Sequence, residues 1–160
     1  MDVIEKFIND HSEVKEEIDI LEKIVNLLNS DAFSWNNVFK ISSFFDKEVK
    51  EHFRLEEQVL FPVMKKVLPS DKQKILAEIE KEHRPILSKL DAFRKIAEKH
   101  SEFLARNTQE NFIRISHEII ESIIPHAKKE DEQLFPLAKI YFKPDNWKQL
   151  EEMYFKYLKV

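Results

Sequence analysis

Four long stretches of the chain carry apolar residues at alternating steps of three and four positions, which is the spacing of one face of an α-helix. The first stretch runs from Ile4 to Leu28, and three more of similar length follow. Rows of this kind are buried when several helices pack against one another. The chain contains no glycine and only six prolines, which removes most of the turn chemistry that β-hairpins need. The sequence therefore predicts an all-α fold.

The apolar rows predict helices near residues 2–29, 35–67, 71–100 and 108–141, and a shorter helix near 145–158. Ser70 with Gln73 predicts a capping box at the start of the third helix, and Asn107 with Glu110 a cap at the start of the fourth. Kinks or early helix ends are expected at the prolines inside or near these spans, namely Pro62, Pro85, Pro125 and Pro136.

Short connections make neighbouring helices antiparallel. We therefore expect residues 1–160 to form a single domain. Its core would be an up-down-up-down four-helix bundle at about 2–141, followed by a short C-terminal helix at about 145–158.

Histidines and glutamates interrupt the four apolar rows. The segment HFRLEEQVLFP at 52–62 is repeated as HAKKEDEQLFP at 126–136, and Asp10-His11 is repeated as Glu82-His83. Each half of the chain thus supplies a lone histidine and then a His-x-x-x-Glu motif. The sequence indicates a duplicated unit with six polar residues directed at the core: His11, His52, Glu56, His83, His126 and Glu130.

These six residues predict a metal site. In antiparallel helices with the expected bounds they lie within about one residue of the same height, so they would converge on one layer of the bundle. Two carboxylates buried without a cation would each cost several kcal/mol in desolvation, roughly, or would stay protonated. A pair of metal ions removes that conflict. The alternative is a purely structural bundle, because a single buried histidine is more often a hydrogen-bonded core residue than a ligand.

The types of donor limit the choice of metal. The chain has no cysteine, so the ligands would be nitrogen and oxygen atoms. If each glutamate bridges two ions, each ion receives about four protein donors, and open positions remain. Those positions suit an oxo or hydroxo bridge and a small ligand such as dioxygen, nitric oxide or peroxide. We expect two non-haem iron ions, with manganese or zinc as alternatives.

Other residues near the motifs each have two possible roles. Glu57 and Asp131 adjoin the two glutamates and are candidates for outer partners or additional ligands, although solvent exposure is the more common position for such acids. His100 and His117 are expected to be structural or exposed. Three aromatic residues are expected either to wall the pocket or simply to fill the core: Phe53, Phe61 and Phe135.

Charge and hydropathy exclude some partners. The net charge is −4, with acids and bases interspersed, which argues against a nucleic-acid or membrane surface. The sequence shows neither a signal-like N-terminus nor an apolar run long enough to span a bilayer. We expect a soluble, cytoplasmic protein, and no protein partner can be named.

The order of lone His, His-x-x-x-Glu, lone His and His-x-x-x-Glu on four helices resembles the hemerythrin-like (HHE cation-binding) family. The resemblance covers roughly residues 2–141. It is specific, because ferritin-type carboxylate bundles use a Glu-x-x-His spacing in place of His-x-x-x-Glu. It implies that the six residues named above are metal ligands. Oxygen-carrying members have a fifth histidine one turn from the third-helix histidine, where this chain has Ile79 and Leu87.

The four-His, two-Glu pattern is more similar to members linked to iron–sulfur cluster repair, nitric oxide response and iron or oxygen sensing. The resemblance therefore implies a di-iron protein that binds or senses oxygen, nitric oxide or peroxide, or that handles iron. An enzyme that turns over one of these molecules is the alternative, and a structural or interaction bundle is the third interpretation.

Overall fold

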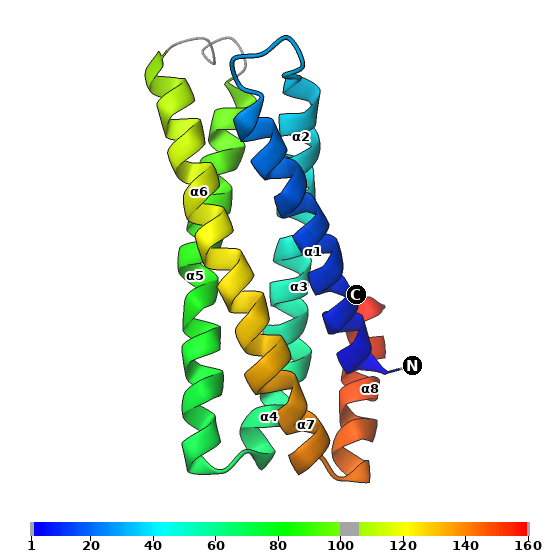
Figure 1. Ribbon diagram of the computed structural model, residues 1–160. Helices are drawn as coiled ribbons and strands as arrows, with labels where there is room; N and C mark the ends of the chain where they lie inside the picture. The colour runs from blue at the N-terminus through cyan, green and yellow to red at the C-terminus, as the bar shows by residue number, and fades with distance from the viewer. Residues whose placement is uncertain (1, 100–105, 160) are drawn as a thin grey trace.

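A computed structural model describes residues 2–99 and 106–159. The described residues form an antiparallel four-helix bundle with a fifth helix packed at one end (Figure 1). The expected all-α bundle is confirmed. The bundle consists of α1 (Val3–Asn26), a second helix from Trp35 to Val67, α5 (Ser70–Glu98) and a fourth helix described from Arg106 to Tyr141.

Five-residue π-helical turns interrupt the second and fourth helices. The second helix is built from α2 (Trp35–Phe44), η1 (Phe45–Val49), α3 (Lys50–Leu55), η2 (Glu56–Leu60) and α4 (Phe61–Val67). The fourth is built from α6 (Arg106–Lys129), η4 (Glu130–Leu134) and α7 (Phe135–Tyr141). π-Turns inside α-helices are rare and occur frequently at functional sites.

Kinks or early helix ends were expected at the prolines, and the helices do not end there. Pro85 and Pro125 lie inside α5 and α6, which continue through them. Pro62 and Pro136 lie in the first turn of α4 and α7, directly after η2 and η4. A proline ring clashes with the carbonyl group four residues earlier, and the wider π-turn provides room for it. Early ends are therefore wrong at all four prolines, whereas kinks stay a prediction.

The two predicted caps are also wrong. Ser70 is the first residue of α5 and makes no side-chain cap, because Pro69 occupies the N-cap position in an extended conformation. The Gln73 side chain instead donates hydrogen bonds to the carbonyl oxygens of Lys65 (2.8 Å) and Leu68 (2.9 Å), which satisfies unpaired carbonyls at the end of α4. Asn107 lies inside α6, where its side-chain oxygen accepts from the Thr108 backbone N–H.

The core consists of two apolar clusters at opposite ends of the bundle. One gathers residues of α4, α7 and α8 (Pro144–Leu158) around Phe7 and Phe61, and the other gathers residues around Phe45 and Phe93. Three of the four core histidines, His11, His83 and His126, lie between the clusters in sequence, and His52 lies just before the change from Phe53 of the second cluster to Leu55 of the first. His11, for example, lies between Phe7 of the first cluster and Val14 of the second. The fold therefore places a polar layer between two apolar ones.

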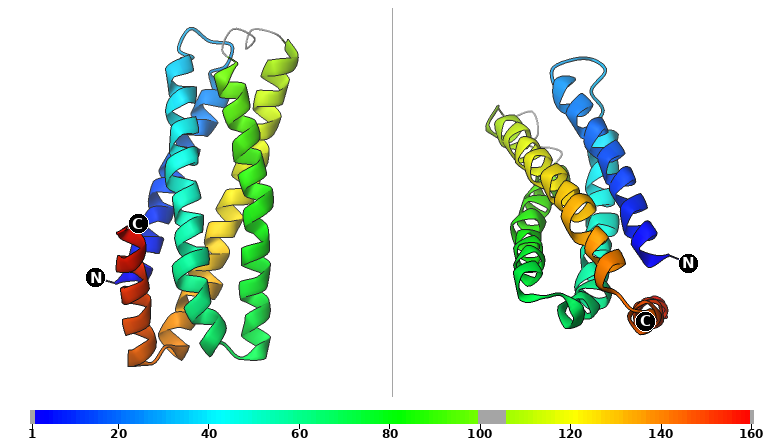
Figure 2. Two further views of the ribbon diagram at one scale, coloured as in Figure 1. Left: turned by 180° about the vertical axis from the view of Figure 1, so that it is seen from behind. Right: turned by 60° about the horizontal axis from the view of Figure 1, so that its bottom comes forward.

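Helix α8 packs along the side of the bundle, next to the start of α1 (Figure 2). Leu150 and Tyr154 are buried against the first cluster, and the Tyr157 hydroxyl donates to Glu51 Oε1 at 2.8 Å. A C-terminal helix was expected at about 145–158, and α8 confirms it. Among the described helices, none combines the length and apolar character needed to cross a membrane.

Candidate metal centre

The structure brings all six predicted site residues together. His11 comes from α1, His52 from α3, His83 from α5 and His126 from α6, while Glu56 and Glu130 are the first residues of the π-turns η2 and η4. All six are buried, and both glutamates have 0% exposed surface. Their donor atoms form two groups that share Glu130: Glu56, His83, His126 and Glu130 in one, and His11, His52 and Glu130 in the other. Within each group these atoms lie within 4.8 Å of one another.

Each glutamate faces histidines from two helices. Glu56 Oε1 lies 2.9 Å from His52 Nε2 and 3.8 Å from His83 Nε2. Glu130 Oε1 lies 3.2 Å from His126 Nε2 and 3.3 Å from His11 Nε2. All four approaches are within ion-pair distance when the histidine is protonated. Among the described residues, neither oxygen of either glutamate has a hydrogen-bond partner. Four unpartnered carboxylate oxygens in an apolar core are what a cation would satisfy.

A second set of carboxylates fixes the orientation of the histidines. Each Nδ1 lies at hydrogen-bonding distance from one acid, and the pairs are His11–Asp131 (2.8 Å), His52–Asp10 (3.0 Å), His83–Glu57 (2.8 Å) and His126–Glu82 (2.9 Å). Because an ionised carboxylate can only accept, each Nδ1 carries a hydrogen, and any ring that holds no second proton presents its Nε2 lone pair to the centre. Histidines that bind metals in proteins are held in this way. His11 Nε2 and His52 Nε2 lie 3.2 Å apart, so in the absence of a cation the proton on His52 can be shared between them.

The outer carboxylates follow the sequence duplication. The acid before each lone histidine, Asp10 or Glu82, accepts from the histidine of the following His-x-x-x-Glu motif. The acid after each buried glutamate, Glu57 or Asp131, accepts from a lone histidine. Glu57 and Asp131 thus act as outer partners while remaining 45% and 40% exposed. A role for Asp10 and Glu82 was not predicted, although each directly precedes a histidine in its half of the chain.

Burial and charge act in opposite directions on these groups. Burial lowers the pKa of His52, but the charges of Glu56 and Asp10 outweigh it and raise the pKa to about 9. Burial and the nearby charge of His52 lower the pKa of His11, and burial lowers that of His126. Burial raises the pKa of Glu56, yet the adjacent His52 outweighs this effect and lowers the pKa overall. Without a bound cation, a proton on His52 partly balances the negative charge of the buried glutamates.

Metal affinity is expected to rise with pH up to about pH 9, because a cation must displace the proton that His52 holds. Competition with one proton predicts about a tenfold gain in affinity per pH unit below that value. The stability of the metal-free protein has the opposite dependence. A histidine with a raised pKa contributes stability that is fully present below its unfolded pKa of about 6.5 and is lost as the pH rises through 9. Isothermal titration calorimetry in buffers of different ionisation enthalpy would measure the released proton, and His52→Gln should abolish the release.

Removal of an outer carboxylate is expected to weaken metal binding without abolishing it. Asp10→Asn and Glu82→Gln would leave His52 and His126 without an ionised acceptor, so their imidazoles would be less basic and less fixed. We expect a loss of about 10- to 100-fold in affinity for each. Competition with a chromophoric chelator would measure the affinity, and Glu80→Gln on the surface of α5 is a matched control. Equal affinities in all three variants would contradict this role.

Aromatic rings wall the histidine layer. Phe53 stacks on His83 with ring centroids 4.0 Å apart, and Phe61 stacks on the same histidine at 5.6 Å. Phe135 stacks on His11 at 5.4 Å, and Phe7 meets His52 edge-on at 5.3 Å. Phe53, Phe61 and Phe135 therefore wall the site as well as filling the core. His117 is exposed, as expected, whereas His100 lies outside the described residues.

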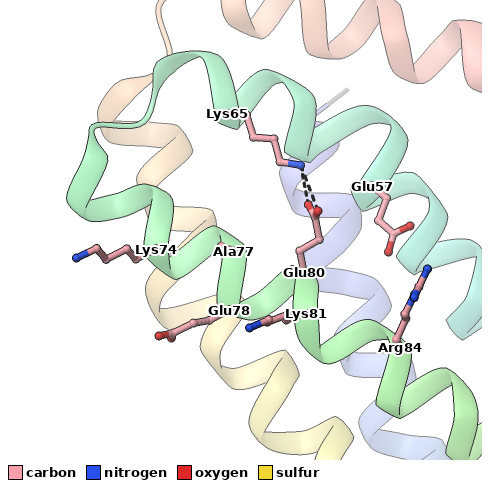
Figure 3. A pocket seen from close by; sticks show the side chains of 8 residues that line it. All are labelled: Glu57, Lys65, Lys74, Ala77, Glu78, Glu80, Lys81 and Arg84. Atoms are coloured by element: carbon pink, nitrogen blue, oxygen red, sulfur yellow. Dashed lines mark hydrogen bonds and ion pairs between the residues drawn. The ribbon is translucent and has the colours of Figure 1, made fainter.

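Glu57 connects the site to the outer surface. It lies on the wall of a groove of about 710 Å³ between the second helix and α5, where Figure 3 shows it facing Arg84. The rest of this groove is lined mainly by charged surface residues, including the ion pair between Lys65 and Glu80 at 2.9 Å. The groove therefore lies outside the histidine layer, and Glu57 is the residue that it shares with the site.

A comparison with protein families decides the relationship of the chain. The model of the hemerythrin HHE cation-binding domain matches residues 2–138, a span that includes all six buried donors and all four outer carboxylates. The chain belongs to the hemerythrin HHE cation-binding family. No curated protein and no solved structure gave a significant match. Membership of this hemerythrin family together with the buried His/Glu groups supports cation binding by the chain.

Proposed function

We propose that the chain holds two iron ions through His11, His52, Glu56, His83, His126 and Glu130, and that it binds or senses oxygen, nitric oxide or peroxide, or handles iron. Both glutamates would bridge the ions, and each histidine would supply Nε2. Bound iron would supply open coordination positions and a change of oxidation state. Manganese or zinc could occupy the same donors.

The four unpartnered oxygens of Glu56 and Glu130 carry this proposal. In a purely structural bundle they would remain desolvated and without hydrogen bonds, which is strongly unfavourable. The donors also fit the group, because neutral imidazole nitrogens and carboxylates without thiolates suit non-haem iron. The four Nδ1–carboxylate pairs orient the imidazoles toward the same centre.

The small-molecule part of the proposal is tested by visible spectroscopy of iron-loaded protein. Ferrous protein exposed to air, to nitric oxide or to peroxide is expected to change spectrum. Protein with Glu56→Ala should show no such change. An iron-loaded protein whose spectrum responds to none of these molecules would leave iron handling as the remaining role.

Steady-state measurements separate a binding protein from an enzyme. Consumption of peroxide or nitric oxide over many turnovers, lost in Glu56→Ala, would favour the enzyme alternative. A single stoichiometric reaction would favour binding or sensing.

A further inference from the structure

The two halves of the site differ at the residue after the second histidine, which is Phe53 in one half and Ala127 in the other. Elsewhere the halves correspond closely. Their four Nδ1–carboxylate pairs match, and the stacking of Phe61 on His83 matches that of Phe135 on His11. The internal symmetry therefore places Ala127 beside His11, as Phe53 lies beside His83.

Phe53 closes the face of the site between α3 and α5. Its ring is nearly parallel to that of His83, with 4.0 Å between centroids and 2° between planes, and it meets the edge of His126 at 5.3 Å. Above it lies a groove of about 400 Å³, which Leu87 also lines. Phe53 is only 4% exposed and His83 only 1%. The groove thus ends on an aromatic ring and stops short of the histidines.

The opposite face, between α1 and α6, has no aromatic ring at the position that corresponds to Phe53. Ala127 stands in place of Phe53, and Lys15 stands in place of Leu87 at the position one turn after the lone histidine. Ala127 is partly exposed despite its small side chain, and Lys15 is exposed. His11 is 8% exposed, the highest value among the six buried donors. Helices α1 and α6 pack side by side along this face (Figures 1 and 2).

We propose that small molecules enter the metal centre between α1 and α6, past Ala127 and Lys15, while Phe53 and Leu87 seal the opposite face. The inference rests on the proposed function, since it requires a metal centre to be reached. Such an entrance would suit ligands of two or three atoms. The two faces differ by the volume of one side chain, a methyl group at Ala127 against a phenyl ring at Phe53, so the space gained is small. The ammonium group of Lys15 favours small anions among such ligands.

The rate of azide binding to iron-loaded protein, followed by stopped-flow absorbance, tests this entrance. Ala127→Phe, which installs the residue of the sealed face, is expected to slow binding by at least about tenfold. Lys15→Leu should slow it by a smaller factor. Adding Phe53→Ala to Ala127→Phe moves the opening to the other face and should restore the rate. Unchanged binding in Ala127→Phe would overturn the proposal.

Iron content separates failure of the entrance from failure of the site. Ala127→Phe and Lys15→Leu should retain the iron content of the unaltered protein, because neither changes a donor or a ring stacked on one, and the rate of every variant is compared per bound iron. If Ala127→Phe does not fold, Phe53→Ala alone decides the question. It should raise the rate by no more than about twofold, because a route is already open, whereas a rise of tenfold or more would place the entrance in the groove. Iron-loaded, unaltered protein that binds no azide would contradict the proposed function instead.

Discussion

Removal of the metal by a chelator is expected to lower the free energy of unfolding by about 4 kcal/mol or more, if the ion is present at about a thousand times its dissociation constant. The reason lies in the layer between the two apolar clusters, where four carboxylate oxygens have no hydrogen-bond partner among the described residues. Loss of the cation would leave these buried charges balanced only by a proton on His52. Thermal and denaturant unfolding with and without chelator would measure the difference.

The matched variants for this prediction are a double substitution in the site and a single one on the surface. His52→Leu with His126→Leu should remove the response to chelator, whereas His117→Leu should keep it, because His117 is exposed on the same helix as His126. A chain whose stability is the same with and without chelator would support the structural interpretation of the bundle.

Glu130→Leu is expected to have opposite effects on metal binding and on stability. Glu130 belongs to both groups of donors, so its loss should remove both ions. The metal-free variant, however, should be more stable than the metal-free parent by about 1–4 kcal/mol, because an unpartnered buried carboxylate is replaced by an apolar side chain of similar size. Metal content and the unfolding midpoint in chelator would be measured on the same preparation.

A suitable control for this substitution is Glu132→Leu, two residues along the same π-turn and exposed. It should leave metal content unchanged and should not stabilise the metal-free protein. A Glu130→Leu protein that is destabilised even without metal would show that the glutamate contributes to the fold itself.

The apolar rows predicted the helices because buried side chains recur with the helical period. The predicted rows are buried in the structure, as Phe7 and His11 on α1 and Tyr154 on α8 illustrate. The duplication made the convergence of the histidines and glutamates predictable, because equal spacing in antiparallel helices gives equal height. Whether the six residues bind metal stays a prediction.

Several features of the site could not be predicted from the row of apolar residues. The π-turns that begin at Glu56 and Glu130 depend on backbone hydrogen bonds, which the pattern of buried side chains does not specify. The partners of the histidine Nδ1 atoms lie far away in the sequence. Asp131, for example, is 120 positions from His11. An acid beside a histidine is also common on exposed helices, so only the packing of the four helices distinguishes Asp10 from an ordinary surface charge.

Elemental analysis of metal bound to untagged protein, together with the visible spectrum, tests the central claim most directly. We predict about two ions per chain in the native protein, with iron bands that are lost in Glu130→Leu. Protein that is folded but contains no metal, or that holds a single zinc ion, would contradict the bridging role of Glu56 and Glu130 and would favour a structural bundle.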